Sequence, residues 1–560
     1  MTFILIYAIL IGMYITEVLT KTKKGLVSHR CLLLRESFRQ EGKVKSRTIA
    51  NLTHCDPGEV AAIRLALKHK DDLTVLKSLN EIEIEQGLSV GAAWLVYQVA
   101  KEIGIEAALG TERSGKLALW QVMARVINQG SRLSAVRLAQ VHAGCDILGL
   151  REGFNEDDLY DNLGWVAKNQ SKIEGRLFSK RPAGKKPELF LYDVTSSYFE
   201  GECNELSDWG YNRDKKAGKK QVVLGLLCDE VGDPVCIEVY RGNTLDFETF
   251  EGQIKKVAQK FGCERVTLVG DRGMIKSGQI TALGEAQFHY ITAITKPQIE
   301  KLLREGVFQM ELFDQDLCEV EQAGLRYVLR RNPERVREIA STRKGKKSSI
   351  EQLCEQANGY LAEHPRARTA RQLKKVENKI AHLKMSGWLG VIAVGKRLEL
   401  KEDAAALEEE AKLDGCYVIK SDLPKEITGQ VIHDRYKDLA QVEQAFRTCK
   451  TGLLEMRPWY VTREDSTRGH ALVVMLAYLV THHLQQAWAS FNLTVEEGLN
   501  QLSLIVSTKI VIKGGESCHR IPRPGRMAAK LLTAVHVHLP QVLPDLGANV
   551  VTRKQLQLCR

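Results

Sequence analysis

The chain has 560 residues, 44% of them hydrophobic and 27% charged, a composition typical of globular proteins. It is long enough for about two to four domains, and the lack of low-complexity tracts or of a repeat at 20–50 residues excludes fibrous and solenoid architectures. Its thirteen cysteines contain no Cys-x-x-Cys pair. This excludes a zinc knuckle, argues against a disulfide framework and favours reduced thiols in the cytoplasm.

The net charge of +11 is concentrated in two segments. Residues 301–400 hold 20 Lys and Arg against 13 Asp and Glu, and residues 501–560 hold 9 against 2. Basic segments of this kind suit a polyanion, most simply the phosphates of DNA or RNA. Solvated helix faces explain the same charge equally well, so composition alone does not decide between the two interpretations.

The N-terminal third is predicted to change from strands to helices. Residues 1–15 contain an apolar run that is too short to span a bilayer and lacks the flanks of a signal peptide. Because Met13 opens a strand pattern, we expect residues 1–12 to be an upstream extension. Residues 13–52 alternate with a period of two, which predicts a small basic β-hairpin. Residues 57–175 have helical spacing and predict a helical domain with room for a DNA-binding helix-turn-helix.

A mixed α/β core is predicted after the linker at residues 180–188. Residues 189–294 follow the order strand, hairpin, helix, strand, helix, strand. A basic, helix-rich stretch at 300–420 interrupts this core and contains two strand-like pieces, at 388–395 and 415–422. A helix is predicted over Tyr436–Lys450, and the apolar run Ala471–Val480 is too short to cross a membrane and predicts a buried helix.

Three acids are placed to meet at one edge of this core. Asp193 is predicted at the end of the first core strand and Asp271 at the end of the fourth, while Glu443 is expected to face inward from the later helix. Three converging carboxylates are the hard oxygen ligands that Mg²⁺ prefers, and two such ions about 4 Å apart can catalyse phosphodiester cleavage. Taken singly, the two aspartates also suit turns or caps, and Glu443 suits a surface ion pair with Lys450.

The order Asp193, Asp271, long insertion, Glu443 resembles the DDE transposases of bacterial insertion sequences. One branch of that family has the signature Tyr-x2-Arg-x3-Glu-x6-Lys, and this sequence has Tyr436, Leu439, Glu443 and Lys450 at the same spacing. Three of the four positions agree, and leucine replaces the arginine. The segments "DVTSSYFEG" and "GYNRDKKAGKKQVVLG" also resemble the region after the first aspartate of the family.

This resemblance implies an RNase H-like mixed-sheet core in which Asp193, Asp271 and Glu443 are both the catalytic residues and the ligands of two Mg²⁺ ions, with Mn²⁺ as a substitute. Tyr436 and Lys450 would bind DNA phosphates, and Arg447 would bind the phosphate that Leu439 cannot. The implied partners are the inverted terminal repeats and target DNA, bound by a homodimer in the cytoplasm, with no membrane. The alternatives are a metal-dependent nuclease without strand transfer and a catalytically silent DNA-binding descendant.

Several other residues carry weaker expectations. His433 and His470 are interpreted as packing or phosphate-contacting residues rather than metal ligands, and Trp388 as a core residue or, less well supported, as a contact to a flipped base. The basic clusters at 343–347 and 520–526 are expected to touch DNA. The predicted regions are an extension at 1–12, a β-hairpin at 13–55, a helical domain at 56–180, the core at 186–300 and 426–490, an insertion at 301–425 and a basic region at 491–560.

Overall fold

The computed structural model divides the chain into two units, residues 1–87 with 507–520, and residues 88–506 with 521–560. Most of the expected upstream extension, residues 1–11, lies outside the described residues. The described residues are 12–21, 27–40, 43–69, 82–181, 187–201, 203–264, 266–452, 454–457, 459–512, 516–544 and 546–558.

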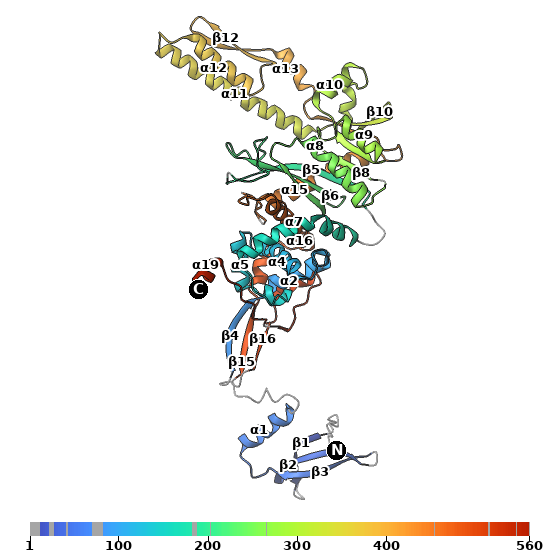
Figure 1. Cartoon of the computed structure of the whole chain (residues 1–560), viewed down its shortest axis with the longest axis vertical. Coiled ribbons are helices and arrows are strands. Elements are labelled where there is room, and N and C mark those ends of the chain that lie inside the picture. The colour runs from blue at the N-terminus through green and yellow to red at the C-terminus, as the bar shows by residue number, and fades with distance from the viewer. Residues whose placement is uncertain are drawn as a thin grey trace. The chain divides into compact units, whose positions relative to one another are not determined.

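The first unit contains the predicted N-terminal hairpin. β1 (Gly12–Lys21), β2 (Val27–Gln40) and β3 (Lys43–Asn51) pair as an antiparallel sheet, so the hairpin is confirmed and gains a third strand (Figure 1). In α1 (Pro57–Lys68), Asp56 caps the first turn and Glu59 completes a capping box.

One element of this unit contradicts the sequence analysis. Residues 82–89 were expected in a helical domain, but they form β4 (Ile82–Ser89), which lies in a sheet with β15 (Val506–Ile512) and β16 (Glu516–Arg520). The "IEIE" alternation at its start has the period of a strand.

An eight-stranded mixed sheet forms the centre of the second unit. Its order is β10-β11-β14-β9-β8-β5-β6-β7. β8 and β9 run parallel to β5, whereas β6 and β7 complete an antiparallel meander from it, which confirms the predicted strand order and the mixed sheet. The five strands of the predicted core are β5 (Leu189–Tyr198), β6 (Gln221–Asp229), β7 (Pro234–Arg241), β8 (Thr267–Gly270) and β9 (His289–Ala293).

Three strands from the expected insertion complete this sheet. They are β10 (Cys318–Gln322), β11 (Leu325–Arg331) and β14 (Cys416–Ser421), which add to the edge beyond β9. Residues 332–415 form a smaller layer with its own core of apolar side chains, which includes Trp388. Its elements are α11 (Pro333–Glu363), α12 (Thr369–His382), β12 (Leu389–Val394), β13 (Arg397–Glu402) and α13 (Ala404–Ala411).

The two faces of the sheet pack on different helices. On one face, Phe190, Tyr192 and Val194 of β5 join a core with α8 (Asp246–Lys255), η3 (Lys256–Lys260) and α9 (Ser277–Glu285). On the other face, Leu189 and Leu191 pack in the core that contains α15 (Leu439–Lys450) and α16 (Glu464–Ala487). Because side chains alternate along a strand, Asp193 belongs to the second face, with α15.

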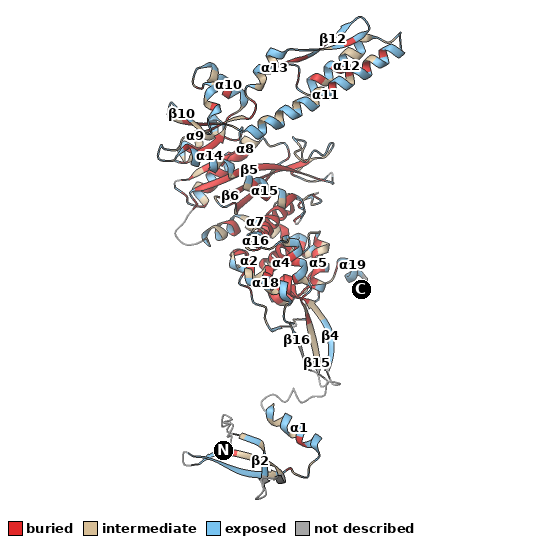
Figure 2. Ribbon diagram, turned by 180° about the vertical axis from the view of Figure 1, so that it is seen from behind, coloured by how far each residue is buried: buried red, intermediate tan, exposed pale blue. Residues whose placement is uncertain are grey.

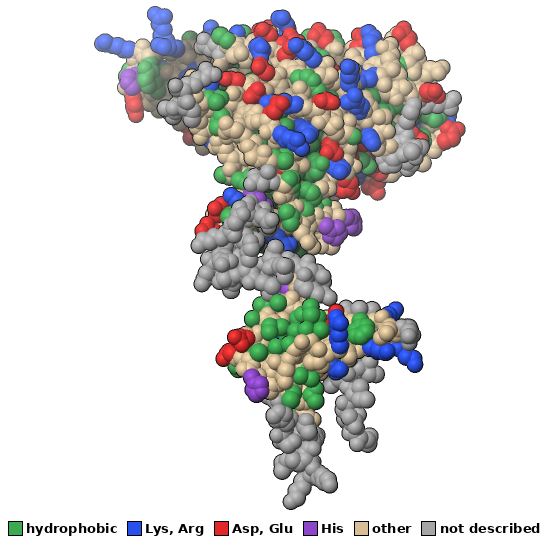
Figure 3. All heavy atoms as spheres, turned by 60° about the horizontal axis from the view of Figure 1, so that its bottom comes forward, with side chains coloured by type: hydrophobic (Ala, Val, Ile, Leu, Met, Phe, Trp, Pro, Cys, Tyr) green, Lys and Arg blue, Asp and Glu red, His purple; other side chains and the backbone are tan. Residues whose placement is uncertain are grey.

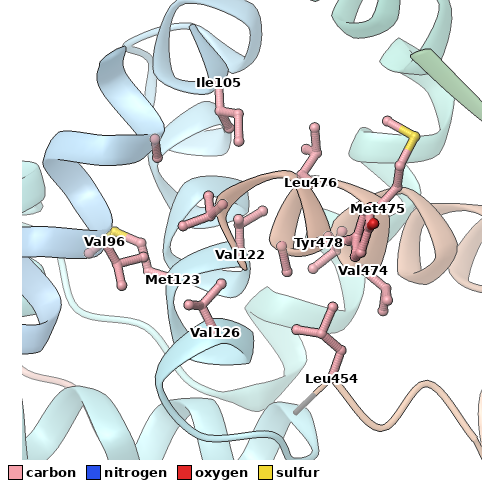
Figure 4. Packing of buried hydrophobic residues seen from close by; sticks show 14 of the residues in the cluster. Val96, Ile105, Val122, Met123, Val126, Leu454, Val474, Met475, Leu476 and Tyr478 are labelled. Carbon is pink, nitrogen blue, oxygen red and sulfur yellow. The ribbon is translucent and has the colours of Figure 1, made fainter. Parts of the chain in front are cut away.

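The predicted helical region packs directly on α16, so it shares a core with the sheet. Figure 4 shows Val122 of α4 (Arg113–Ile127) facing α16, which carries Leu476, while Met123 lies beside Val96 in the same core. Figure 2 shows α16 as a buried helix, as its apolar run predicts. Within the described part of the chain, no helix is both long and apolar enough to cross a membrane. The other helices of this core include α2 (Gly91–Glu102), α7 (Glu156–Ser179), α17 (Val495–Ser503) and α18 (Arg526–Ala534).

Candidate active site

Asp193 and Asp271 are neighbours across two parallel strands. In the pairing of β5 with β8, Tyr192 is opposite Gly270, so the next residues along the two strands are Asp193 and Asp271. Adjacent strands are about 4.8 Å apart, which brings the two backbones equally close. Asp271 follows the end of β8, as expected. Asp193, in contrast, lies in the middle of β5, because this strand continues to Tyr198.

Glu443 reaches the same face from α15, but the expected single helix is wrong. Residues 436–450 belong to two helices, α14 (Gly429–Lys437) and α15, which meet at Asp438. Val442, Ala445, Phe446 and Cys449 form the buried side of α15, whereas Glu443 is exposed. The Glu443 carboxylate therefore lies at the solvent-facing edge of the buried side of α15. The sequence analysis had predicted that it faces inward.

The charges of Asp271 and Glu443 both act on the carboxylate of Asp193. The pKa of Asp193 is raised from its usual 3.8 to about 7, mainly because burial disfavours the charged carboxylate. A hydrogen bond from the Val194 amide and the charge of Arg213 oppose this rise, while the charges of Asp271 and Glu443 add to it. Because Asp271 and Glu443 both repel a negative charge on Asp193, a cation bound beside Asp193 would offset this repulsion.

Asp271 also forms a hydrogen bond with Tyr436, another residue of the predicted site. The hydroxyl of Tyr436 donates to Oδ1 of Asp271 over 3.0 Å, and the same oxygen accepts from the Arg272 amide over 2.7 Å. Burial, followed by the charge of Asp271, raises the pKa of the Tyr436 hydroxyl, so this group remains a donor. Among the residues that the structure describes, no group of three or more His, Cys, Asp or Glu side chains converges closely enough to hold a metal ion.

Comparison of the sequence with family models assigns the chain to a family. The family model of the transposase DDE domain matches residues 184–480, more than half of the chain and all three acids. The chain belongs to the DDE transposase family. Residues 16–75 also match the N-terminal domain of IS1634 family transposases, so this is a bacterial insertion-sequence DNA transposase.

Two further comparisons are less informative. No curated protein matches the chain significantly. A solved piggyBac transposase synaptic complex with hairpin DNA is 9% identical and aligns over 74% of this chain and 76% of that one. Its TM-score of 0.36 is below the level that indicates a shared fold.

The resemblance implies that Lys450 of the transposase contacts a DNA phosphate, but the side chain is buried in the structure. Its ammonium donates to Oγ1 of Thr195 over 2.7 Å, to the Ser196 carbonyl, and to Oδ1 of Asp214 over 3.1 Å. Burial lowers the pKa of Lys450, and its interaction with Asp214 opposes this effect. Arg457 pairs with the same carboxylate. Lys450 thus ties the end of α15 to β5.

Leu439 and Arg447 lie on different sides of α15. Leu439 is buried in the core of the transposase, which explains how an apolar residue is accommodated where the signature has arginine. Arg447 is exposed one turn beyond Glu443, and the side chains of residues four apart on a helix are neighbours. The guanidinium of Arg447 is therefore accessible beside the third acid.

The other aromatic and histidine residues singled out from the sequence are packing residues. Trp388 is 3% exposed in the core of the 332–415 layer, so the base-contact interpretation is wrong. His433 is buried and bonded to the Tyr417 hydroxyl over 2.7 Å. His470 is buried against Arg132, and burial lowers its pKa well below the usual value. Neither histidine is near the acids in any contact of the described residues.

Two basic side chains of the cluster at 343–347 pair with acids of the protein itself. Arg343 makes a bidentate pair with Asp414, and Lys347 pairs with Glu402. Among the basic residues of this cluster, only Lys344 is fully exposed. Figure 3 likewise shows Lys and Arg side chains mixed with acids over the visible face. Of the cluster at 520–526, Arg523 and Arg526 are exposed, and their contact with DNA stays a prediction.

The sequence analysis missed Asp214 and Arg213. The side chain of Asp214 is 3% exposed and lies between Lys450 and Arg457, and Arg213 forms a two-bond pair with Asp246. Both residues lie in the "GYNRDKKAGKK" segment, whose resemblance to the family assigns them no roles. An acid next to three basic residues is typical of a solvated turn, so the pattern held no signal for the burial of Asp214.

Proposed function

We propose that Asp193, Asp271 and Glu443 are the catalytic residues and metal ligands with which this DNA transposase cleaves the ends of its element and joins them to target DNA. The observation that carries the proposal is the raised pKa of Asp193, which arises from burial and from the charges of the other two acids. Perturbed carboxylates of this kind are typical of functional sites.

The residues fit a divalent cation by their chemistry. All three donors are carboxylates, the ligand type that Mg²⁺ and Mn²⁺ favour, and a bound cation would offset their mutual repulsion. When bound, a pair of such ions supplies activation of the attacking oxygen and stabilisation of the leaving one. Glu443 is exposed on α15, Asp193 lies within β5, and Asp271 directly follows β8.

The protein groups around the acids support this role. The Tyr436 hydroxyl orients Asp271, and Lys450 holds α15 on β5 so that Glu443 stays on the face of Asp193. Arg447 would bind a phosphate next to Glu443, since a guanidinium matches phosphate oxygens in two-bond geometry. In this proposal Tyr436 and Lys450 act on DNA mainly through the residues that they position.

A cleavage and joining assay tests the proposal. Linear DNA carrying the element's ends is incubated with Mg²⁺, with Mn²⁺ or with EDTA, and pre-cleaved ends are offered to a plasmid. Asp193→Asn, Asp271→Asn and Glu443→Gln should each lose both reactions, while the matched surface variant Glu426→Gln retains them. Cleavage without joining would favour a nuclease. Activity retained in any of the three variants would contradict the assignment.

The assembly is the remaining part of the proposal. We expect two copies of the transposase to pair two inverted terminal repeats in the cytoplasm, beside the target DNA. Mass measurement of the protein with and without an end oligonucleotide checks this, because a dimer on DNA doubles the protein mass per complex.

A further inference from the structure

The segment from Asp208 to Gln221 connects β5 with β6 and is closed at its base. Asp208 and Gln221 exchange two backbone hydrogen bonds of 3.0 Å. Near the start of the segment, Gly210 packs against the carbonyl of Gly242, where a Cβ atom would lie only 2.1 Å from that oxygen. The segment is thus fixed to the sheet at its start and at its end.

The acid in its middle is buried and ties the segment to the candidate active site. Asp214 accepts from the Tyr198 amide of β5 over 3.3 Å and pairs with Lys450 of α15 and with Arg457. Asn212 adds bonds to the Asp214 amide and to the Lys216 carbonyl. These contacts hold residues 212–216 in one conformation before any partner binds.

Two large aromatic side chains point away from this rigid base. Trp209 is 59% exposed and Tyr211 is 82% exposed. Exposed apolar surface marks an interaction site where it is contiguous, and Trp209 and Tyr211 are only two residues apart in this segment. Their backbone is held by the contacts described above, so the exposure is built into the segment.

The solvent side of the segment carries several basic side chains, of which Arg213 is paired with Asp246. The Arg213 guanidinium lies 5.8 Å from the Tyr211 ring centre, and the Lys216 ammonium lies 5.7 Å from that of Tyr198. Lys215 is exposed, and no ion pair of its ammonium occurs among the described residues. The two acids of the segment do not pair with these lysines. Asp208 accepts a hydrogen bond from the Trp209 amide, and the Asp214 side chain is buried against Lys450. Aromatic rings flanked by cations suit bases flanked by phosphates better than they suit another protein surface.

The segment also lies next to the acids. The Arg213 amide donates to the Ser196 hydroxyl over 2.8 Å, and Ser196 lies three residues beyond Asp193 on β5. A strand cut at Asp193 would therefore have its unpaired nucleotides within reach of this surface.

We infer that Trp209, Tyr211 and Lys215 form a single-strand binding surface, on which the Tyr211 ring stacks with an unpaired base and Lys215 binds a phosphate. The inference rests on the proposed DNA chemistry and extends it to the handling of single-stranded DNA beside the cleavage site. Arg213 occupies one side of the Tyr211 ring and leaves the rest of the ring open to the base.

The test measures binding of the full-length protein to a fluorescein-labelled oligonucleotide of mixed sequence, single-stranded or as its duplex, in EDTA. Tyr211→Ala should weaken single-strand binding about 5- to 150-fold, the range for loss of one stacked base, and affect the duplex less. Tyr211→Phe and Tyr211→Trp should restore it. Tyr360→Ala, a matched exposed tyrosine in α11, should bind as the wild type does. Lys215→Ala should reduce the slope of affinity against salt by about 0.7.

Three results would overturn the inference. Equal single-strand affinity of Tyr211→Ala and wild type rules out stacking on this ring, and an equal loss on the duplex rules out a preference for single strands. A changed oligomer mass of Tyr211→Ala without DNA would make the surface a protein interface. End cleavage by the wild type is scored separately: cleavage with unchanged Tyr211→Ala binding refutes only this inference, whereas a wild type that neither binds nor cleaves DNA refutes the proposed function.

Discussion

Replacing Asp193 with asparagine should change how the stability of the transposase depends on pH. The pKa of Asp193 is about 7 in the folded protein and 3.8 ordinarily, so the folded state holds this proton more tightly than the unfolded state. Stability from this group is therefore greatest at low pH and is lost as pH rises from about 4 to about 7. At about 1.36 kcal/mol for each tenfold change in proton affinity, the upper limit of the loss is about 4 kcal/mol.

Partial exposure of the Asp193 side chain reduces this limit, and we expect a loss of about 2 kcal/mol. The asparagine variant cannot lose a proton, but its side-chain oxygen can still accept from the Val194 amide. In EDTA, the Tm of Asp193→Asn should match the wild type near pH 4 and exceed it by a few degrees at pH 8. Adding Mg²⁺ or Mn²⁺ at pH 8 should raise the wild-type Tm and leave the variant unchanged.

Differential scanning calorimetry from pH 4 to pH 8 measures both effects. Asp316→Asn removes an exposed carboxylate distant in sequence from the three acids, and its Tm should follow the wild type at every pH. Parallel curves for Asp193→Asn and the wild type would show that Asp193 ionises normally in the fold. In that case the three acids would not form one electrostatically coupled site, whatever the cleavage assay shows.

Four further substitutions test side-chain packing in the protein. Asp214→Ala leaves the buried Lys450 without its carboxylate and should lower the free energy of unfolding in urea by about 3–5 kcal/mol. Lys450→Met should lower it less, because Asp214 still pairs with Arg457. Equal losses in the two variants would contradict this pairing. Trp388→Ala should cost about 3–5 kcal/mol and speed hydrogen exchange in α11, and a loss confined to DNA binding would restore the base-contact interpretation. Leu439→Arg restores the family signature but buries a charge, so the Tm of this variant should fall. An unchanged Tm together with faster end cleavage would show that the position accepts the charge.

The sequence predicts the strands of the core well because their signals are local. Asp193 and Asp271 each follow an apolar run, and the register of β5 with β8 places them side by side as expected. The position of Asp193 within its strand was not predictable, since "VTSSY" after it has mixed polarity. What continues the strand is pairing with β6, from Asp193 opposite Leu226 to Tyr198 opposite Gln221.

The errors concern long-range packing. β14 pairs with β9 across more than a hundred residues, and β11 and β10 join the sheet through β14, so no local pattern distinguishes these strands from those of a separate insertion. In α15, helical spacing grouped Glu443 with Lys450 on one face, and residues seven apart differ by only about 20° around a helix, so both lie near the same edge of the buried stripe. Lys450 falls on the buried side of that edge and Glu443 on the exposed side.

This division of α15 has a mechanical consequence for the site. An exposed Glu443 on a freely sliding helix would not keep a fixed distance from Asp193, because a shift of one residue moves a helix by about 1.5 Å along its axis. Lys450 prevents that shift through its bonds to Thr195, two residues beyond Asp193 on the same face of β5, and to Asp214. The buried lysine and its aspartate therefore set the register between the helix that carries the third acid and the strand that carries the first.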